Sequence, residues 1–209
     1  MLRSQRSLKI AWCNIVMTPV PSDMVLVAAP PQKTKCVVLG IGNVLMSDDG
    51  AGVHIVRHLI RSFTCRGAEF FGDVDLVDGG TLGYLLIDRV SNADLMIVLD
   101  AANIGEAPGS FRPYEGDLVY EFLSDRQNRS VHEVGLIDLI QMMDLSGEAP
   151  KDLVLVGVQP ESIDWGERLS PSVQKIVPIV AEEVERLLDA WIGHAPDRLH
   201  TSMDRETCP

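Results

Sequence analysis

Two hydrophobic patterns alternate along the chain from Lys35 onward. Short, nearly continuous apolar runs rich in β-branched residues, such as residues 36–41, are typical of strands buried on both faces. Longer stretches with apolar residues three or four positions apart, such as residues 51–63, are typical of amphipathic helices. The pattern therefore predicts strands and helices in alternation.

The boundaries of these elements follow from turn residues and from changes of period. The predicted strands are residues 36–41, 74–77, 95–99, 110–114 (at a sheet edge) and 153–158. The predicted helices are residues 51–63, 82–90, 133–143 and 171–191. Thr81 is expected to cap the second helix, and Pro178 is expected to kink or break the last one.

Strands that alternate with helices, several of them apolar on both faces, indicate a mostly parallel sheet between helical layers. We therefore expect an α/β fold, a three-layer αβα sandwich with a mostly parallel twisted sheet of about five strands. The expected domain spans residues 35–192. Residues 1–34 are expected to be a disordered extension, or to contain the true translation start at Met17 or Met24, and residues 193–209 are expected to be a flexible tail.

Composition narrows the classes of partner. The 209 residues carry a formal net charge of −12, which would repel a phosphate backbone, so we expect no nucleic-acid partner. No apolar run approaches the roughly 20 residues needed to span a bilayer, so we expect no membrane partner. The four cysteines include no Cys-x-x-Cys pair, which argues against zinc-ribbon and iron–sulfur sites. Their scatter favours reduced thiols in a cytoplasmic protein.

Acidic residues follow three of the predicted strands. Asp48 and Asp49 lie in the loop after the first strand, Asp78 ends the second, and Asp100 ends the third. The carboxyl ends of parallel strands meet at one edge of a sheet, where ligands collect. Carboxylates gathered there repel one another unless a cation or a shared proton relieves the repulsion. The arrangement predicts a metal site or acid–base chemistry.

Gly40 and Gly42 begin a pattern that also occurs in dinucleotide-binding loops. The full pattern needs a third glycine where this chain has Leu45. Asp48 and Asp49 would also face a pyrophosphate with like charge. A tight strand-to-loop turn is the simpler explanation of the two glycines.

Three histidines are candidate metal ligands. His132 stands at the start of a predicted helix, where a solvated or capping role is commoner, although neutral imidazole binds nickel and zinc well. His54 and His58 are one helical turn apart, a spacing that can bind metal. No glutamate follows His54, as a zinc-peptidase helix requires, so an exposed helix face better explains this pair.

Five segments resemble, in the same order, the motifs of the hydrogenase maturation endopeptidases. These segments are residues 38–53 (VLGIGNVLMSDDGAGV), 77–81 (VDGGT), 97–101 (IVLDA), 130–136 (SVHEVGL) and 156–161 (VGVQPE). Members of this family trim the C-terminal extension from the large subunit of nickel–iron hydrogenases. Five ordered segments are far more specific than any one of them.

The resemblance implies that Asp49, Asp100 and His132 bind metal, and that Asp49 and Asp100 are catalytic. The implied metal is nickel, supplied by the hydrogenase large-subunit precursor rather than carried by the protease. The resemblance thus implies an aspartic-type endopeptidase that acts on this precursor in the cytoplasm. Either the metal or a nearby carboxylate would activate the attacking water. We expect the protein to be a monomer.

Two other acidic residues are expected to be structural, Asp48 as a cap of the first helix and Asp78 as a brace for the Gly79–Gly80 turn. Two alternative functions stay open. One is a non-catalytic α/β module that binds a nucleotide or a metal, and the acidic loop after Gly42 argues against a nucleotide. The other is a peptidase like the spore germination proteases, which explains residues 157–160 less well.

Overall fold

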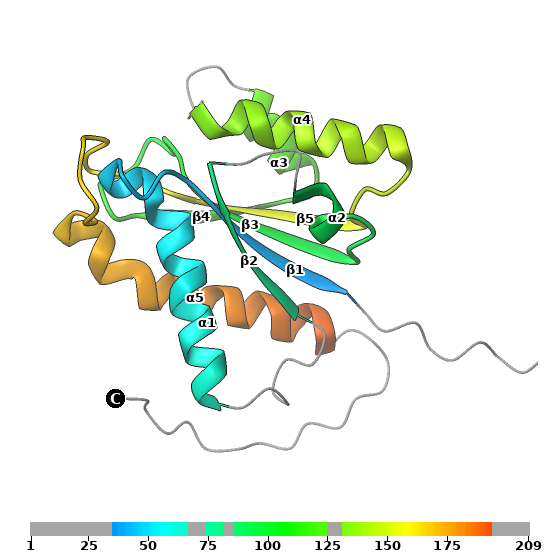
Figure 1. Cartoon of the computed structure of the whole chain (residues 1–209), viewed down its shortest axis with the longest axis horizontal. Coiled ribbons are helices and arrows are strands. Elements are labelled where there is room, and N and C mark those ends of the chain that lie inside the picture. Colours follow the sequence, from blue (N-terminus) through cyan, green and yellow to red (C-terminus); the bar gives the residue numbers. More distant parts are fainter. Residues whose placement is uncertain (1–34, 67–73, 82–85, 125–130, 194–209) are drawn as a thin grey trace, which may run out of the picture. The chain divides into compact units, whose positions relative to one another are not determined.

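The computed structural model describes residues 35–66, 74–81, 86–124 and 131–193, without the side chains of residues 131–134 (Figure 1). The predicted N-terminal extension and C-terminal tail lie outside the described residues, apart from Gly193, which belongs to the last helix. The domain boundaries therefore stay predictions.

Five strands form one sheet in the order β2-β1-β3-β5-β4. They are β1 (Cys36–Ile41), β2 (Val74–Gly80), β3 (Leu95–Ala101), β4 (Phe111–Glu115) and β5 (Asp152–Val158). The pairs β1–β2, β1–β3 and β3–β5 are parallel, whereas β4–β5 is antiparallel. The predicted mostly parallel sheet is confirmed, with β4 at an edge.

Helices cover both faces of this sheet. They are η1 (Ser47–Gly50, a 3-10 helix), α1 (Ala51–Arg66), α2 (Ile87–Val90), α3 (Asp117–Ser124), α4 (Val131–Ser146) and α5 (Pro171–Gly193). Figure 1 shows α1 and α5 on one face and α3 and α4 on the other. The predicted three-layer αβα sandwich is therefore confirmed.

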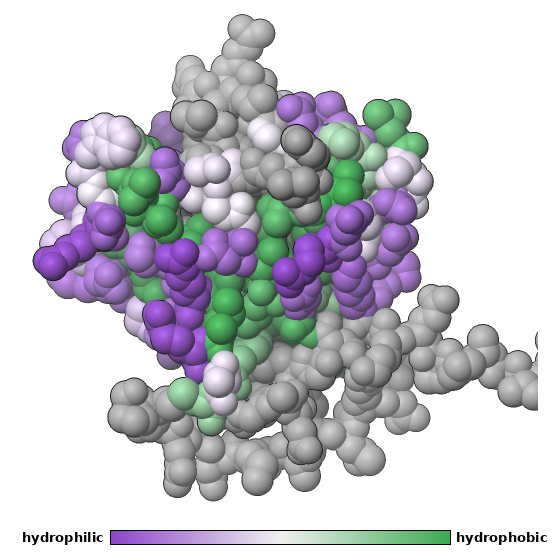
Figure 2. All heavy atoms as spheres, viewed as in Figure 1, coloured by the Kyte–Doolittle hydropathy of each residue, from purple (hydrophilic) through white to green (hydrophobic). Residues whose placement is uncertain are grey.

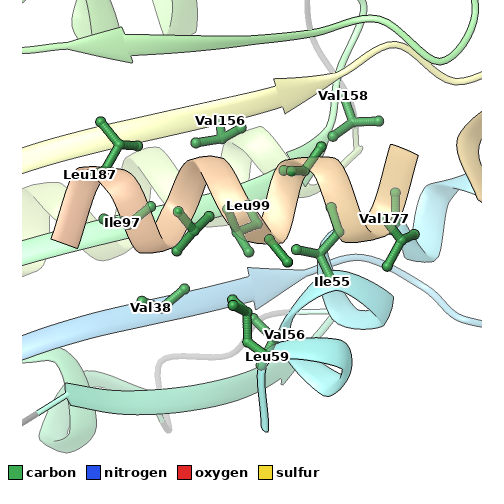
Figure 3. Close-up of a cluster of buried hydrophobic side chains, with 14 of the residues drawn as sticks. Val38, Ile55, Val56, Leu59, Ile97, Leu99, Val156, Val158, Val177 and Leu187 are labelled. Atoms are coloured by element: carbon green, nitrogen blue, oxygen red, sulfur yellow. The ribbon is translucent and has the colours of Figure 1, made fainter. Parts of the chain in front are cut away.

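Alternate residues of the central strands contribute to two separate cores. Val38, Ile97 and Val156 are buried under α1 and α5, as Figure 3 shows. Their sequence neighbours Val37 and Met96 are buried in the opposite core, together with residues of α3 and α4. Burial on both faces explains why these strands are continuous apolar runs rather than alternating ones.

The region around β2 differs from the prediction in two ways. The strand continues through Gly80, where a turn was expected, because Asp78 and Gly80 keep pairing with β1. The N-cap of α2 is Leu86, so the prediction that Thr81 caps this helix is wrong. The predicted first turn of the helix, residues 82–85, lies outside the described residues.

Two helices show what local patterns miss. Helix α3 was not predicted, although Val119, Phe122 and Leu123 have helical spacing and are buried. Pro178 lies inside α5, which is nevertheless one continuous helix, so the predicted break is absent. Val177 and Val180, on either side of this proline, are buried in the core, and their packing offsets the lost backbone hydrogen bond.

Two further expectations concern thiols and membranes. Cys36 is a buried free thiol, which agrees with the expectation of reduced cysteines at this position. Within the described part of the chain, no helix is both long enough and apolar enough to cross a membrane.

Candidate active site

The sheet order places β1 and β3 at the point where the chain reverses its direction across the sheet. From β1 the chain crosses to β2 on one side, and it then returns to β3 on the other side. In open α/β sheets, ligands bind beyond the carboxyl ends of the strands at this point. The loop after β1 contains Asp49, and Asp100 lies near the end of β3. The two predicted ligands therefore border the usual ligand position of this fold.

Both carboxylates are nearly removed from solvent. Asp49 is 5% exposed, and its Oδ2 accepts a hydrogen bond of 3.0 Å from the backbone N–H of Asn43. Asp100 is 1% exposed and lies opposite Gly157 in the register of β3 and β5. Because η1 contacts β3, the structure brings the two residues to the same edge of the sheet.

His132 is the second residue of α4, and its side chain lies outside the described part of the structure. Among the side chains that are described, no group of three His, Cys, Asp or Glu residues could hold a metal ion. Since that set does not include His132, the predicted ligand set of Asp49, Asp100 and His132 stays a prediction.

Asp48, directly before the candidate ligand, has a different environment. It is fully buried, and its Oδ2 accepts backbone N–H groups from Glu161 at 2.9 Å and Ser162 at 3.1 Å. Its Oδ1 accepts the N–H of Ser170 at 2.7 Å. Asp48 is therefore structural, as expected, but the predicted helix cap is wrong. Its carboxylate instead fixes the loop between β5 and α5.

The segment after β5 also organises the loop that follows β3. Gln159 Oε1 accepts the backbone N–H groups of Ile104 at 2.9 Å and Gly105 at 3.1 Å. Two residues later, Glu161 donates its N–H to Asp48. Residues 159–161 thus connect the loops that follow the two site strands. The segment is recognisable in the sequence as a motif, but its contacts join residues more than 50 positions apart and could not be predicted from it.

Two glycines allow backbone segments to meet at this edge. A Cβ on Gly52 would lie 2.0 Å from the carbonyl oxygen of Leu99, so only glycine lets the first turn of α1 reach the end of β3. Gly42 has φ +134° and donates its N–H to Gly80 O at 2.7 Å. The explanation of Gly40 and Gly42 as part of a tight strand-to-loop turn is confirmed at Gly42.

Asp78 and Arg57 form an exposed ion pair near the end of β2. Arg57 approaches Asp78 Oδ2 at 2.9 Å, and the N–H of Gly80 donates to Asp78 Oδ1 at 3.2 Å. The predicted brace of residues 79 and 80 is therefore confirmed. A solvent-screened pair of this kind contributes little to stability.

His54 lies on the same helix as Arg57, and its Nε2 is buried without a hydrogen-bond partner among the described residues. Burial is the largest cause that lowers the pKa of His54, and the positive charges of Arg57 and Arg61 lower it further. Asp78 opposes this shift. Among the described residues, His54 and His58 belong to no metal-binding group. Both side chains are partly buried, so the expectation of an exposed helix face is wrong.

Comparison with known proteins decides between the possible families. The sequence profile described as hydrogenase maturation protease matches residues 53–187, more than half of the chain. The chain belongs to the hydrogenase maturation protease family. The matched span includes Asp100 and His132 and begins after Asp49.

Individual family relatives cover most of the domain. The hydrogenase expression/formation protein HupD of Rhizobium leguminosarum bv. viciae is 34% identical over 163 residues, 78% of each chain. The hydrogenase 2 maturation protease of Escherichia coli K12 is 33% identical over 151 residues, 72% of this chain and 88% of the relative. The solved structure of the hydrogenase maturating endopeptidase HybD from E. coli superposes with a TM-score of 0.66 at 31% identity. That match covers 76% of this chain and 94% of HybD.

Proposed function

We propose that this protease removes the C-terminal extension of a nickel–iron hydrogenase large-subunit precursor after nickel has been inserted. Asp49, Asp100 and His132 would bind the nickel of the precursor, and Asp49 and Asp100 would also take part in catalysis. The observation that carries this proposal is the burial of Asp49 and Asp100 at one edge of the sheet in a member of this family.

The chemistry of these carboxylates supports a cation at this edge. Removing two like charges from water is costly, and a positive ion beside them offsets much of that cost. Two carboxylates and one imidazole suit borderline nickel(II), and three ligands leave coordination positions for groups of the precursor. The neighbouring Asp48 cannot replace Asp49 as a ligand, because its two oxygens already accept three backbone N–H groups.

The reaction follows from this arrangement. Nickel already bound in the precursor is part of the substrate, and contact with Asp49 and Asp100 would place the scissile peptide bond at the sheet edge. A water molecule would attack the peptide carbonyl, and its proton would pass to one of the carboxylates, whether or not the nickel of the precursor also polarised that water. The C–N bond then breaks, and the leaving amine takes up a proton. A precursor without nickel would not be held and would stay uncut.

The alternatives considered from the sequence have less support. A germination-type protease would belong to another family, whereas this chain belongs to the hydrogenase maturation proteases. A non-catalytic α/β module would bind its ligand without cutting the precursor. The proposal also includes action in the cytoplasm, which cell fractionation would test. It includes a monomeric state, which size-exclusion chromatography would test.

Two substitutions test the assignment of the carboxylates. We expect Asp49→Asn and Asp100→Asn each to lower the rate of precursor processing by at least about 100-fold, because each removes a charged ligand that also takes part in proton transfer. The measurement is the size shift of a nickel-loaded precursor on a denaturing gel. Asp88→Asn, an exposed aspartate of α2, is the matched control and should process normally. Normal processing by both site variants would contradict the assignment.

A further inference from the structure

Three large apolar side chains are exposed beside the segment that carries Asp49. Leu45 and Ile163 are each 47% exposed, and Trp165 is 83% exposed. We call these three residues the Trp165 patch. Figure 2 shows hydrophobic surface among hydrophilic side chains on the left of the view, where η1 and the loop before α5 lie in Figure 1. Exposed apolar groups that gather in one place commonly mark an interaction site.

Backbone hydrogen bonds tie the patch to the candidate active site. The N–H of Gly166 donates to Leu45 O at 2.9 Å, and the N–H of Ser47 donates to Gly166 O at 2.7 Å. Ser47 Oγ also donates to the carbonyl oxygen of Asp164 at 3.0 Å. Trp165 therefore lies between two residues that bond to the chain directly before Asp49. A protein bound at the patch would contact the same edge of the molecule.

The loop that carries Trp165 is held in place from both sides. Asp48 accepts N–H groups at residues 161, 162 and 170, and Ser162 Oγ donates to Asp164 Oδ2 at 2.6 Å. An exposed tryptophan on an anchored loop loses little conformational freedom when it binds, which is the usual property of an interface hot spot. Among the described residues, Trp165 has little packing, since 83% of it stays exposed.

We propose that the Trp165 patch docks the precursor through an apolar segment flanked by basic side chains, an inference that rests on the proposed function. The patch is bordered by the exposed acidic residues Asp164 and Glu167 and by the exposed Arg168, so its rim carries a net negative charge that complements basic side chains. A second copy of this chain fits less well. Its net charge is also −12, and a two-fold contact would bring the acidic rims of both copies together.

The variant Trp165→Ala tests this docking role. We expect KM for the nickel-loaded precursor to rise about 10-fold or more while kcat stays unchanged, because the patch binds substrate without touching the reacting atoms. Leu145→Ala is the matched control, since Leu145 is an 89% exposed apolar residue near the end of α4. The control should keep the KM of the unchanged protein. Equal thermal melting curves would show that both variants fold.

Calorimetric binding of the precursor separates a failure of docking from a failure of the proposed function. Docking predicts weaker binding by Trp165→Ala than by Leu145→Ala, even if the unchanged protein were found not to cut the precursor. Unaltered KM and unaltered binding in Trp165→Ala would overturn the docking role while leaving the protease assignment intact. If the unchanged protein were a dimer and Trp165→Ala a monomer, the patch would be the contact between two copies of this chain. That result would also overturn the proposal.

Discussion

At the scale of single residues, two adjacent aspartates have different roles because their partners differ. Asp48 is enclosed by three backbone N–H groups of the loop before α5. Asp49 lies in the loop after β1, and its Oδ2 accepts the N–H of Asn43. The family resemblance had already assigned different roles to these two identical side chains, and the contacts with the distant residues 161–170 give the physical reason why Asp48 is structural.

The substitution Asp48→Asn should destabilise the fold. Asparagine has a single acceptor oxygen, so at least one backbone N–H would face the amide NH₂ and lose its charged acceptor. We expect the free energy of unfolding to fall by about 2–4 kcal/mol. Urea denaturation measures this loss, and Asp88→Asn should stay within about 0.5 kcal/mol of the unchanged protein. A stability of Asp48→Asn equal to that control would refute the structural role.

His54 should make stability depend on pH. Its pKa in the folded state is lowered from 6.5 by burial and by Arg57 and Arg61. Above pH 6.5 the imidazole is neutral in both states, and its contribution to stability is fully present. As pH falls below 6.5 the unfolded chain binds the proton more readily, so this contribution is lost.

The matching experiment compares urea denaturation at pH 7 and pH 5. His54→Gln should lose less stability over this interval than the unchanged protein, because it lacks the group that titrates. His58→Gln, one turn away on the same helix, should behave like the unchanged protein. An equal loss in His54→Gln and in the unchanged protein would show that His54 does not contribute.

At the scale of elements, hydrophobic periodicity predicted most of the fold. The bounds of β1 agree with the prediction, and β3, β5 and α1 begin or end within three residues of it. Contacts across the sheet decided the rest. Pairing with β1 extends β2 through Gly80, and packing in the core lets α5 continue past Pro178. Neither contact is visible in a local pattern.

The approach of α1 to β3 is the element contact on which the candidate site depends. We expect Gly52→Ala to lower the free energy of unfolding by about 1–3 kcal/mol, because the new methyl group would overlap the carbonyl oxygen of Leu99. Moving α1 away would also separate η1 from β3 and reduce precursor processing. Gly193→Ala is the control, since a Cβ there meets open space. Normal stability and processing in Gly52→Ala would contradict this role.

At the scale of the whole molecule, topology explains why part of the site could be predicted. Parallel strands place their carboxyl ends at one edge, so Asp49 and Asp100 were expected together, and the structure places both there. The Trp165 patch could not be predicted in this way. Leu45 and Trp165 are 120 positions apart in the sequence. They lie close together because Gly166, which follows Trp165, forms backbone hydrogen bonds with Leu45 and Ser47. The patch and the two carboxylates thus form one edge that could receive a folded precursor.

The most direct test is to incubate the unchanged protein with nickel-loaded and with nickel-free large-subunit precursor and to measure the mass of the large subunit. Binding of the precursor's nickel by Asp49, Asp100 and His132 predicts a shortened subunit from the nickel-loaded precursor only. Equal cleavage of both precursors would contradict the dependence on nickel. Cleavage of neither would contradict the proposed protease function.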